Sequence, residues 1–355
     1  MPSGVLILYI GSGHESNNER PSSCVDGSTV NRFRRRRLLI AAAGLPLVLR
    51  AAFAQSPTKS ARIGIIEFGA APDSGSVRVY LAALGQLGYA ESGTLQVERR
   101  YAQGDPARFA ELVRDLAAKN VGLAFTVGND IARIAKEVAP ELPIVTVGSE
   151  DPVASGLIQG YRRPGGNVTG VTYLSPQLAA KRLELLKEAV PRLVRVAVLW
   201  DPAHFDTYYR DMESPARTLG VQLQLVEART PNEIDAAIAV ARKKNAEALF
   251  VVPSRVFNSH AKRIGQLALA ARMPVMAAYA IFTEAGGLLS YGAVAAEMLQ
   301  RAAAQTAEIL RGAKAGDLPY EQAATFELVV NLGTAKALGL AVPRSVLLRA
   351  DRVID

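Results

Sequence analysis

Several residue combinations that identify common enzymes are missing from this sequence of 355 residues. There is no G-x-S-x-G nucleophile elbow, no H-E-x-x-H zinc motif and no G-x-x-x-x-G-K-[ST] phosphate loop. The histidines that follow residue 54, His204 and His260, are too far apart in sequence to suggest a metal site by spacing. We therefore expect no catalysis, no cofactor and no metal.

Cysteine is nearly absent, because Cys24 is the only one. It precedes the apolar segment discussed next, so a chain processed after that segment has no disulfide and no thiol nucleophile. A chain of about 300 residues can bury an adequate core without disulfides. This length suggests two domains of ordinary size.

Long hydrophobic runs are also lacking. The most apolar segment, Leu38 to Leu49, contains Pro46 and is shorter than the roughly 20 residues that a membrane-spanning helix needs. It follows the arginines of "RRRRLLIAAAGLPLVLRAAFAQS" (34–56) and precedes Ala-Phe-Ala. A basic start, a short apolar middle and small residues before a cleavage point are typical of a secretory signal.

We therefore predict that residues 1–54 are an export leader, cleaved near Ala54, which directs the protein to the periplasm. The paired arginines resemble a twin-arginine signal, although the sequence does not decide between the twin-arginine and Sec routes. Residues 1–31 fit neither type, and a start codon assigned too early would explain them. A nucleic-acid-binding arm is the alternative, but such arms are not followed by an apolar run and Ala-x-Ala.

Excess positive charge is weaker than the total of +8 suggests. Residues 1–54 hold seven basic and three acidic side chains, so the remainder carries +4. This small excess is poor evidence for a polyanionic partner, and we expect no nucleic-acid binding.

After the leader, apolar strand-like segments alternate with amphipathic helical segments in two series. The expected strands of both series are 61–68, 94–102, 121–127 and 142–147, then 195–200, 221–228, 248–253 and 273–279. Such alternation implies parallel sheets with right-handed crossovers. The sequence therefore predicts an α/β protein with two doubly wound parallel-sheet lobes.

The tail contains too few elements for a third domain. It has strand-like segments at 287–292 and 325–331 and a long helix at 294–312. Adding these elements to the two lobes makes the chain cross between them near 168–174, 288–292 and 318–326, which forms a hinge. The predicted N-terminal lobe is 60–171 plus 290–318, and the C-terminal lobe is 172–289 plus 319–355. We interpret "RRPGGNVTG" (162–170) as a turn leading into the first crossing.

Polar and aromatic residues follow the predicted strands. In open α/β sheets ligands bind beyond the carboxyl ends of the strands, so two such edges that face each other form a closing pocket. Arg255 is expected to clamp a ligand carboxylate, and helix N-termini near Asn129 add free N–H groups. The candidate ligand-binding residues are Glu67, Phe68, Gly128, Asn129, Asp130, Ser149, Asp151, His204, Phe205, Ser254, Arg255 and Tyr279.

Three segments resemble those of the ABC-transporter substrate-binding proteins related to the tryptophan/tyrosine binding protein. They are "SEDPVASGLIQGYRRPGGNVTGVTYLSP" (149–176), "AGGLLSYG" (285–292) and "LPYEQAATFELVVNLGTAKALGLAVPRSVLLRADRVI" (318–354). The resemblance covers about residues 60–355. It implies a type I periplasmic binding fold, a ligand in the interlobe cleft, and delivery to an ABC permease in the inner membrane.

Two loops depart from that family. The loop after 248–253 commonly carries an aspartate that holds a ligand ammonium group, and here it contains Ser254 and Arg255. The loop after 195–200 commonly carries Asn and Glu, and here it reads "DPAHFDTYY". The hypothesis that follows is a ligand with a carboxylate and no amine, such as an aromatic acid.

The leading interpretation is a monomeric periplasmic solute-binding protein that captures a small carboxylate-bearing molecule by hinge closure. An exported α/β enzyme without a recognisable cofactor motif is the alternative. A transcription regulator with the same two-lobed fold would need a helix-turn-helix before the first lobe, where this sequence has its apolar leader.

Overall fold

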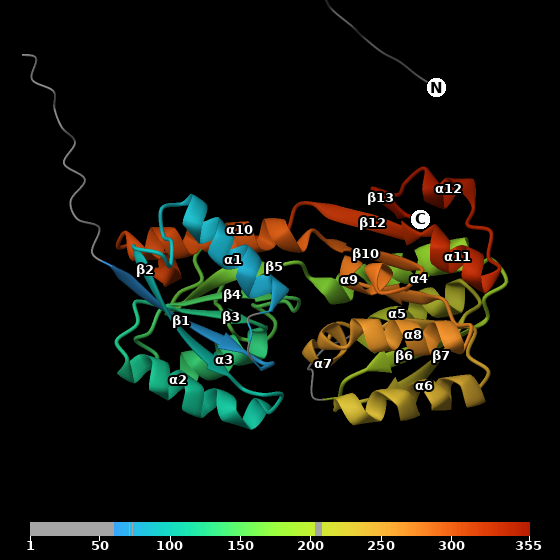
Figure 1. The fold of residues 1–355 in the computed structure, drawn as a ribbon, viewed down its shortest axis with the longest axis horizontal. Coiled ribbons are helices and arrows are strands. Elements are labelled where there is room, and N and C mark those ends of the chain that lie inside the picture. The colour runs from blue at the N-terminus through green and yellow to red at the C-terminus, as the bar shows by residue number, and fades with distance from the viewer. Residues whose placement is uncertain (1–59, 71, 73, 203–207) are drawn as a thin grey trace, which may run out of the picture. The chain divides into compact units, whose positions relative to one another are not determined.

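A computed structural model describes residues 60–355 apart from 71, 73 and 203–207. Two open, mostly parallel sheets, each covered by helices on both faces, form two lobes (Figure 1). The predicted fold class, two doubly wound α/β lobes, is therefore confirmed. The predicted export leader lies outside the described residues. Within the described part of the chain, no helix is long and apolar enough to cross a bilayer.

The sheet of the N-terminal lobe has six strands, and all its pairings are parallel. In chain order they are β1 (Ala61–Glu67), β2 (Leu95–Tyr101), β3 (Ala124–Val127), β4 (Ile144–Gly148), β5 (Val168–Thr172) and β11 (Glu321–Gln322). Their order across the sheet is β11-β5-β4-β3-β1-β2. The central strands are apolar on both faces, as expected for a parallel sheet buried between helices.

Two pairs of helices cover this sheet. α1 (Gly75–Gln86) and α10 (Ala295–Leu310) pack on one face, and α2 (Phe109–Ala118) and α3 (Asn129–Val138) pack on the other (Figure 1). Asp105 caps the short 3-10 turn before α2 by accepting from the Ala107 N–H at 3.0 Å. Apolar residues at a spacing of 3.6 per turn form one apolar face on each helix, and these faces cover the two sides of the sheet.

The sheet of the C-terminal lobe has seven strands in the order β13-β12-β10-β9-β8-β6-β7. They are β6 (Arg195–Trp200), β7 (Gln222–Glu227), β8 (Ala248–Val251), β9 (Val275–Ala277), β10 (Leu289–Ala293), β12 (Phe326–Asn331) and β13 (Arg352–Ile354). Only the pairing of β10 with β12 is antiparallel among the described strands. The first five strands of each lobe therefore repeat one order, with the second strand at the edge and the first beside it.

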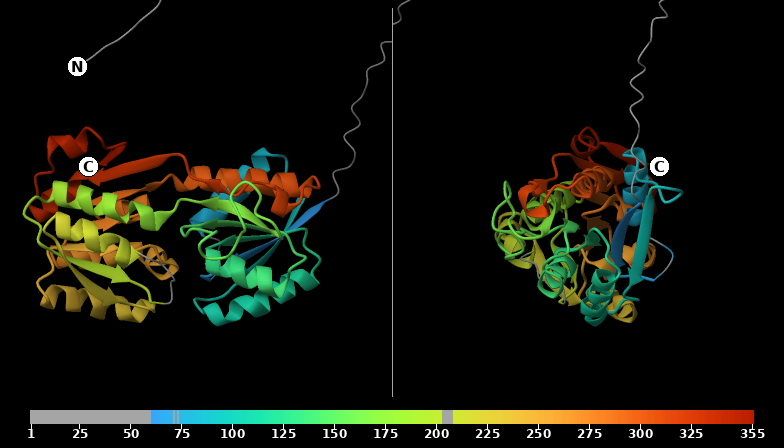
Figure 2. Two further views of the ribbon diagram at one scale, coloured as in Figure 1. Left: turned by 180° about the vertical axis from the view of Figure 1, so that it is seen from behind. Right: turned by 90° about the vertical axis from the view of Figure 1, so that its left-hand side faces the viewer.

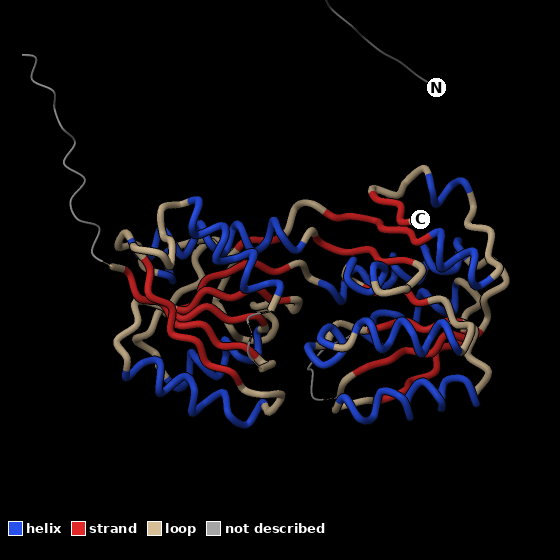
Figure 3. The backbone as a smooth tube through the Cα atoms, viewed as in Figure 1, coloured by secondary structure: helices blue, strands red, loops and turns tan. Residues whose placement is uncertain are grey.

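Helices cover both faces of this second sheet as well (Figures 2 and 3). They are α4 (Ala179–Ala189), α5 (Tyr208–Thr218), α6 (Ile234–Lys243), α7 (Arg255–Ser259), α8 (Ala261–Ala270), α9 (Ala280–Glu284), α11 (Leu332–Leu338) and α12 (Arg344–Leu347). α4 and α5 share one core with the tail helices, whereas α6 and α8 share the other.

Two of the three crossings between the lobes fall inside the segments that the sequence indicated, 168–174 and 318–326, and the other follows Ala293, just after 288–292. β5 belongs wholly to the six-stranded sheet, so part of the segment interpreted as a turn is a strand. β10 extends to Ala293 within the seven-stranded sheet, and β11 returns to the six-stranded one. The boundaries expected at 171, 290 and 318 therefore move to the ends of β5, β10 and β11.

A fully buried arginine ties two of these crossings together. Arg182, on α4, donates from Nε to the carbonyl of Tyr291 in β10 at 2.6 Å and from Nη1 to the carbonyl of Ser175 at 3.1 Å. Ser175 follows the first crossing, and Tyr291 precedes the second. A cation held in the core by backbone carbonyls fixes the spacing of the two hinge segments, because losing either contact leaves a buried polar group without its partner.

A buried hydrogen bond joins α1 to α10, which returns to the N-terminal lobe from the far end of the chain. The hydroxyls of Tyr80 and Thr306 are 2.7 Å apart, and the Tyr80 ring stacks on Phe125 at 3.7 Å. Burial raises the pKa of Tyr80, so this hydroxyl remains a neutral partner.

We expect Tyr80→Phe to lower the free energy of unfolding by about 1–2 kcal/mol, because the buried Thr306 hydroxyl loses its partner. Adding Thr306→Val should recover most of that loss, since both polar groups are then removed. Urea unfolding of the two single variants and the double variant measures the coupling. Additive losses would contradict the hydrogen bond.

Candidate functional site

Ten of the residues expected to bind a ligand are described by the structure. All of them lie at or just after the carboxyl end of a strand. Glu67 and Phe68 end or follow β1, and the others follow β3, β4, β8 and β9. These are Gly128, Asn129 and Asp130; Ser149 and Asp151; Ser254 and Arg255; and Tyr279. His204 and Phe205 lie outside the described residues. The topology thus places the candidates of each lobe along one edge of its sheet.

One ion pair joins the two edges. Arg255, at the start of α7, donates from both Nη atoms to the two carboxylate oxygens of Asp130, at 2.6 and 2.5 Å. Asp130 lies in the first turn of α3, on the other lobe. The bidentate geometry expected of Arg255 is present, but its acceptor is a carboxylate of the same chain.

Two phenyl rings receive the same arginine. The guanidinium carbon of Arg255 lies 5.1 Å from the ring centroid of Phe68 and 5.7 Å from that of Phe109. The rings contact each other, with centroids 6.4 Å apart. Phe109 is not among the residues that the sequence indicated for the site. Only the fold shows that the start of α2 lies beside the loop after β1.

A pair of tyrosines makes a second contact between the lobes. Tyr173, just after β5, donates its hydroxyl to that of Tyr279 at 2.7 Å, and the rings meet edge to face at 5.6 Å. Burial raises the pKa of Tyr173. Tyr279 was expected in the site and Tyr173 was not. A polar aromatic residue at a predicted crossing was the available signal.

The side chain of Asn129 is the least satisfied polar group in this region. The residue is only 2% exposed, and neither its amide nitrogen nor its oxygen has a hydrogen-bond partner among the described residues. It lies over Gly148, where a Cβ atom would be 1.5 Å from the Asn129 oxygen. Asn129 begins α3, whose first-turn N–H groups have no acceptor inside the helix. A buried amide beside these donors can receive an anionic group.

Two of the expected residues organise their own loops. Asp151 accepts from the N–H groups of Val153 and Ala154 at 2.9 and 3.2 Å and from the hydroxyl of Tyr161 at 3.1 Å. Burial, with the Asp151 charge beside it, raises the pKa of Tyr161 to about 12. Glu67 accepts from the Ser74 N–H at 3.0 Å, where α1 begins.

Two serines connect neighbouring loops. Ser254 caps α7 by accepting from the Val256 N–H at 3.2 Å and donates to an Asp201 carboxylate oxygen at 2.9 Å. The carbonyl of Ser149 accepts from the Ser175 N–H at 2.8 Å. These contacts hold the loops in place and leave few degrees of freedom at the sheet edges.

A cavity of about 530 Å³ lies where the two edges meet. The N-terminal lobe contributes Glu67, Phe68 and Gln103 to its lining, and the C-terminal lobe contributes Arg229, Arg255, Asn258 and His260. Within the described residues, no group of three or more side chains is suited to hold a metal ion. Of the described residues expected to bind a ligand, three line this cavity, Glu67, Phe68 and Arg255. The others do not line it: Gly128, Asn129, Asp130, Ser149, Asp151, Ser254 and Tyr279. The cavity therefore offers one phenyl ring and several hydrogen-bonding side chains around a space of small-molecule size.

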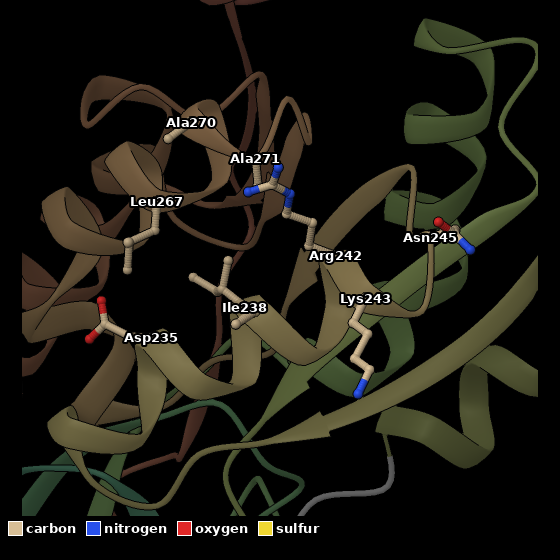
Figure 4. A pocket seen from close by; sticks show the side chains of 9 residues that line it. Asp235, Ile238, Arg242, Lys243, Asn245, Leu267, Ala270 and Ala271 are labelled. Atoms are coloured by element: carbon tan, nitrogen blue, oxygen red, sulfur yellow. The ribbon is translucent and has the colours of Figure 1, made fainter.

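A second hollow lies elsewhere, between α6 and α8 of the C-terminal lobe (Figure 4). Ile238 and Leu267 form its apolar floor, and Arg242 and Lys243 lie at its rim. Its lining runs along α6 from Asp235 to Lys243 and includes the C-terminal end of α8, and it contains none of the strand-end residues. This groove is therefore separate from the candidate site.

Comparisons with known proteins agree on one family. The profile described as "ABC transporter substrate binding protein" matches residues 75–354. A tyrosine-binding protein of Clostridioides difficile (strain R20291) is 23% identical over 264 residues, which cover 74% of this chain and 75% of the relative. Among solved structures, an ABC domain in complex with L-Trp from Streptococcus pneumonia has a TM-score of 0.75 at 24% identity. It covers 83% of this chain and 100% of its own.

A conserved domain protein from Vibrio cholerae O1 biovar El Tor strain N16961 is similar to the same extent. Its TM-score is 0.75 and its identity 24%, over 83% of this chain and 100% of that one. At these identities the structural likenesses establish the fold.

Gly128 has a backbone conformation and surroundings that exclude a side chain. Its φ is +123°, and a Cβ atom would lie 2.6 Å from Nη1 of Arg255 and 2.7 Å from a carboxylate oxygen of Asp130. Gly88 also has a positive φ, +92°, but nothing lies within 4 Å of its Cβ position.

We expect Gly88→Ala to lower the free energy of unfolding by about 1 kcal/mol through backbone strain alone. Gly128→Ala should cost at least about 1 kcal/mol more, because it also displaces the Arg255–Asp130 pair. Urea unfolding of both variants measures the difference. Equal losses would mean that the space around Gly128 is not constrained by the pair.

Proposed function

The chain belongs to the ABC transporter substrate-binding proteins, and from this premise we propose that it captures a small molecule between its two lobes for an importer. The observation that supports this most is the meeting of the two strand edges. Polar and aromatic side chains from both sheets gather around one cavity, and ion-pair and tyrosine contacts join the edges. A molecule bound there touches both lobes and stabilises their closure.

Closure follows from the three crossings. A ligand that contacts both lobes binds the closed form more tightly than the open form, so it shifts the population toward closure. The Arg182 contacts keep two crossings at a fixed spacing, which favours rotation of the lobes about the hinge as rigid bodies. An ABC permease in the inner membrane then recognises the closed surface of the monomer.

The ligand carries a carboxylate and an aromatic ring in this proposal. Since both Nη atoms of Arg255 already bind Asp130, we assign the carboxylate to the N-terminus of α3 and the buried Asn129 amide. Asn129 is not part of the cavity lining, but it lies two residues after Val127, which is. Phe68 and Tyr279 supply aromatic surface. A tyrosine-binding relative and a similar structure in complex with L-Trp support this choice. Tyrosine and tryptophan each have an aromatic ring and a carboxylate. The loop after β8 carries Ser254 and Arg255 where related proteins commonly have an aspartate for a ligand ammonium group, so we infer a ligand without an amine.

Export to the periplasm depends on residues 1–54 in this proposal. The proposed leader carries the chain to the periplasm and is removed near Ala54. Fractionation of the expressed full chain, with N-terminal sequencing of the product, tests both points. Retention in the cytoplasm with an intact N-terminus would contradict them.

Ligand identity is tested with matched pairs of probes. 3-(4-Hydroxyphenyl)propionate and indole-3-propionate are L-tyrosine and L-tryptophan without the amine. We expect the amine-free member of at least one pair to bind more tightly in calorimetry and to raise the melting temperature. Tight binding of tryptophan together with no binding of aromatic carboxylates would overturn the ligand proposal.

We expect Asn129→Ala to weaken binding of the probe that binds by about tenfold or more, because a charged ligand group loses a buried hydrogen-bond partner. Asn167→Ala is the control. The Asn167 amide donates to the carbonyls of Leu142 and Ala139, away from the strand ends that form the site, so its loss should alter stability and leave affinity unchanged. Calorimetry at 25 °C measures both. Equal affinities of Asn129→Ala and the parent chain would remove Asn129 from the site.

A further inference from the structure

A side chain of the C-terminal lobe is seated in a socket built entirely by the N-terminal lobe. The guanidinium of Arg255 lies against Phe68 and Phe109 and binds both carboxylate oxygens of Asp130. Three separate segments contribute to this socket: the loop after β1, the start of α2 and the first turn of α3. We call this arrangement, Arg255 within Phe68, Phe109, Asp130 and Gly128, the arginine latch.

Gly128 completes the socket by having no side chain. A Cβ atom there would lie 2.6 Å from Nη1 of Arg255, well inside van der Waals contact. The N-terminal lobe is therefore shaped to admit a planar guanidinium at this position. Arginine suits the socket better than lysine, because its flat fork can bind a carboxylate bidentately while it stacks on aromatic rings.

Both partners are fixed to their own lobes. Ser254 caps the helix that begins with Arg255 and also binds Asp201, so the start of α7 is held to the C-terminal lobe. Asp130 lies on α3, whose neighbouring residues Ile131 and Ala132 are buried in the N-terminal core. Separating the lobes therefore cannot leave the pair intact and must expose both charges to water.

The pair is also better shielded than ion pairs confined to one lobe. Its side chains are 18% and 24% exposed, compared with 41% and 44% for Arg263 and Asp235 within the C-terminal lobe. Exposed pairs contribute little because water and salt screen them. A bidentate pair that is partly desolvated and stacked on two rings contributes more.

We propose that the ion pair of the arginine latch, Arg255 with Asp130, holds the lobes together before any ligand binds, and so tunes ligand affinity by setting how much of the free protein is closed. Its effect on affinity rests on the proposed function, whereas its effect on the ligand-free protein does not. The apparent dissociation constant equals the intrinsic one divided by the fraction of free protein in the binding-competent form. If the latch raises the closed fraction, it tightens binding of every ligand that requires closure by the same factor.

Fluorescence transfer between the lobes tests the latch in the absence of ligand. Because Cys24 is the only cysteine, Cys24→Ser allows specific labelling of the full chain at Glu111→Cys on α2 and Ala236→Cys on α6, which are both exposed. We expect most molecules of the ligand-free parent to show high resonance energy transfer between the two dyes, which indicates the closed form. Asp130→Asn and Arg255→Gln should each shift the closed-to-open ratio by at least about fivefold toward lower transfer.

Several comparisons separate the latch from general destabilisation. Arg263→Gln removes an ion pair within one lobe and should leave transfer unchanged. Arg255→Lys should fall between the parent and Arg255→Gln, and the double variant Asp130→Asn with Arg255→Gln should be no more open than either single variant. Raising NaCl from 0.1 to 1 M should open the parent more than the double variant.

Unchanged transfer in ligand-free Asp130→Asn and Arg255→Gln, with both variants folded by circular dichroism, would overturn the latch. If these variants lost binding of 3-(4-hydroxyphenyl)propionate or L-tryptophan without any change in ligand-free transfer, the two residues would be ligand contacts, and the proposal would fail. A failure of every probe to bind would count against the proposed ligand and would leave the transfer measurement fully interpretable.

Discussion

The polarity of parallel strands is the constraint on which the rest of this structure depends. Because β1 to β5 are parallel to one another, and β6 to β10 likewise, the loops that follow the strands of each set emerge at one edge of its sheet. The same strand order is used in both lobes. Residues as distant in sequence as Asp130 and Arg255 therefore come to opposing positions, without any local motif to announce them. In the proposed function, the three chain crossings allow these edges to approach or separate.

Most of the fold could be predicted from the sequence because its signals are local. Apolar runs such as 61–68 and 195–200 became strands with nearly the expected bounds, since a strand buried on both faces has no other plausible environment. β5 escaped detection because Gly165, Gly166 and Asn167 immediately before it favour a turn, and only pairing with β4 makes the next five residues a strand. The lobe boundaries shifted for the same reason: short strands such as β11 are defined by their neighbours.

The candidate site was less accessible to sequence reasoning. The strand-end rule places the expected residues at the correct edges, but it cannot say which of them are already committed to the protein. Asp151 resembles a ligand contact in the sequence and instead holds its own loop through Val153, Ala154 and Tyr161. Arg255 was likewise predicted to bind a carboxylate. That carboxylate belongs to Asp130, which is 125 positions away in the sequence, and only the fold brings the two residues together. Phe109 and Tyr173 were missed because their roles arise only from that packing.

Polar groups with hydrogen-bond partners in the chain and polar groups without them have different roles at the site. The side chains of Arg255, Ser254 and Asp151 form hydrogen bonds with other groups of the chain. These hydrogen bonds stabilise the positions of the loops and of the two lobes. Asn129 is buried with no such partner among the described residues, and a group of this kind is costly to the folded protein unless something else binds it. A ligand that hydrogen-bonds to Asn129 gains affinity from a desolvation penalty that folding has already incurred. In the proposed function, Asn129 therefore contributes to ligand specificity, and in the proposed latch the contacts between lobes set how readily the site closes.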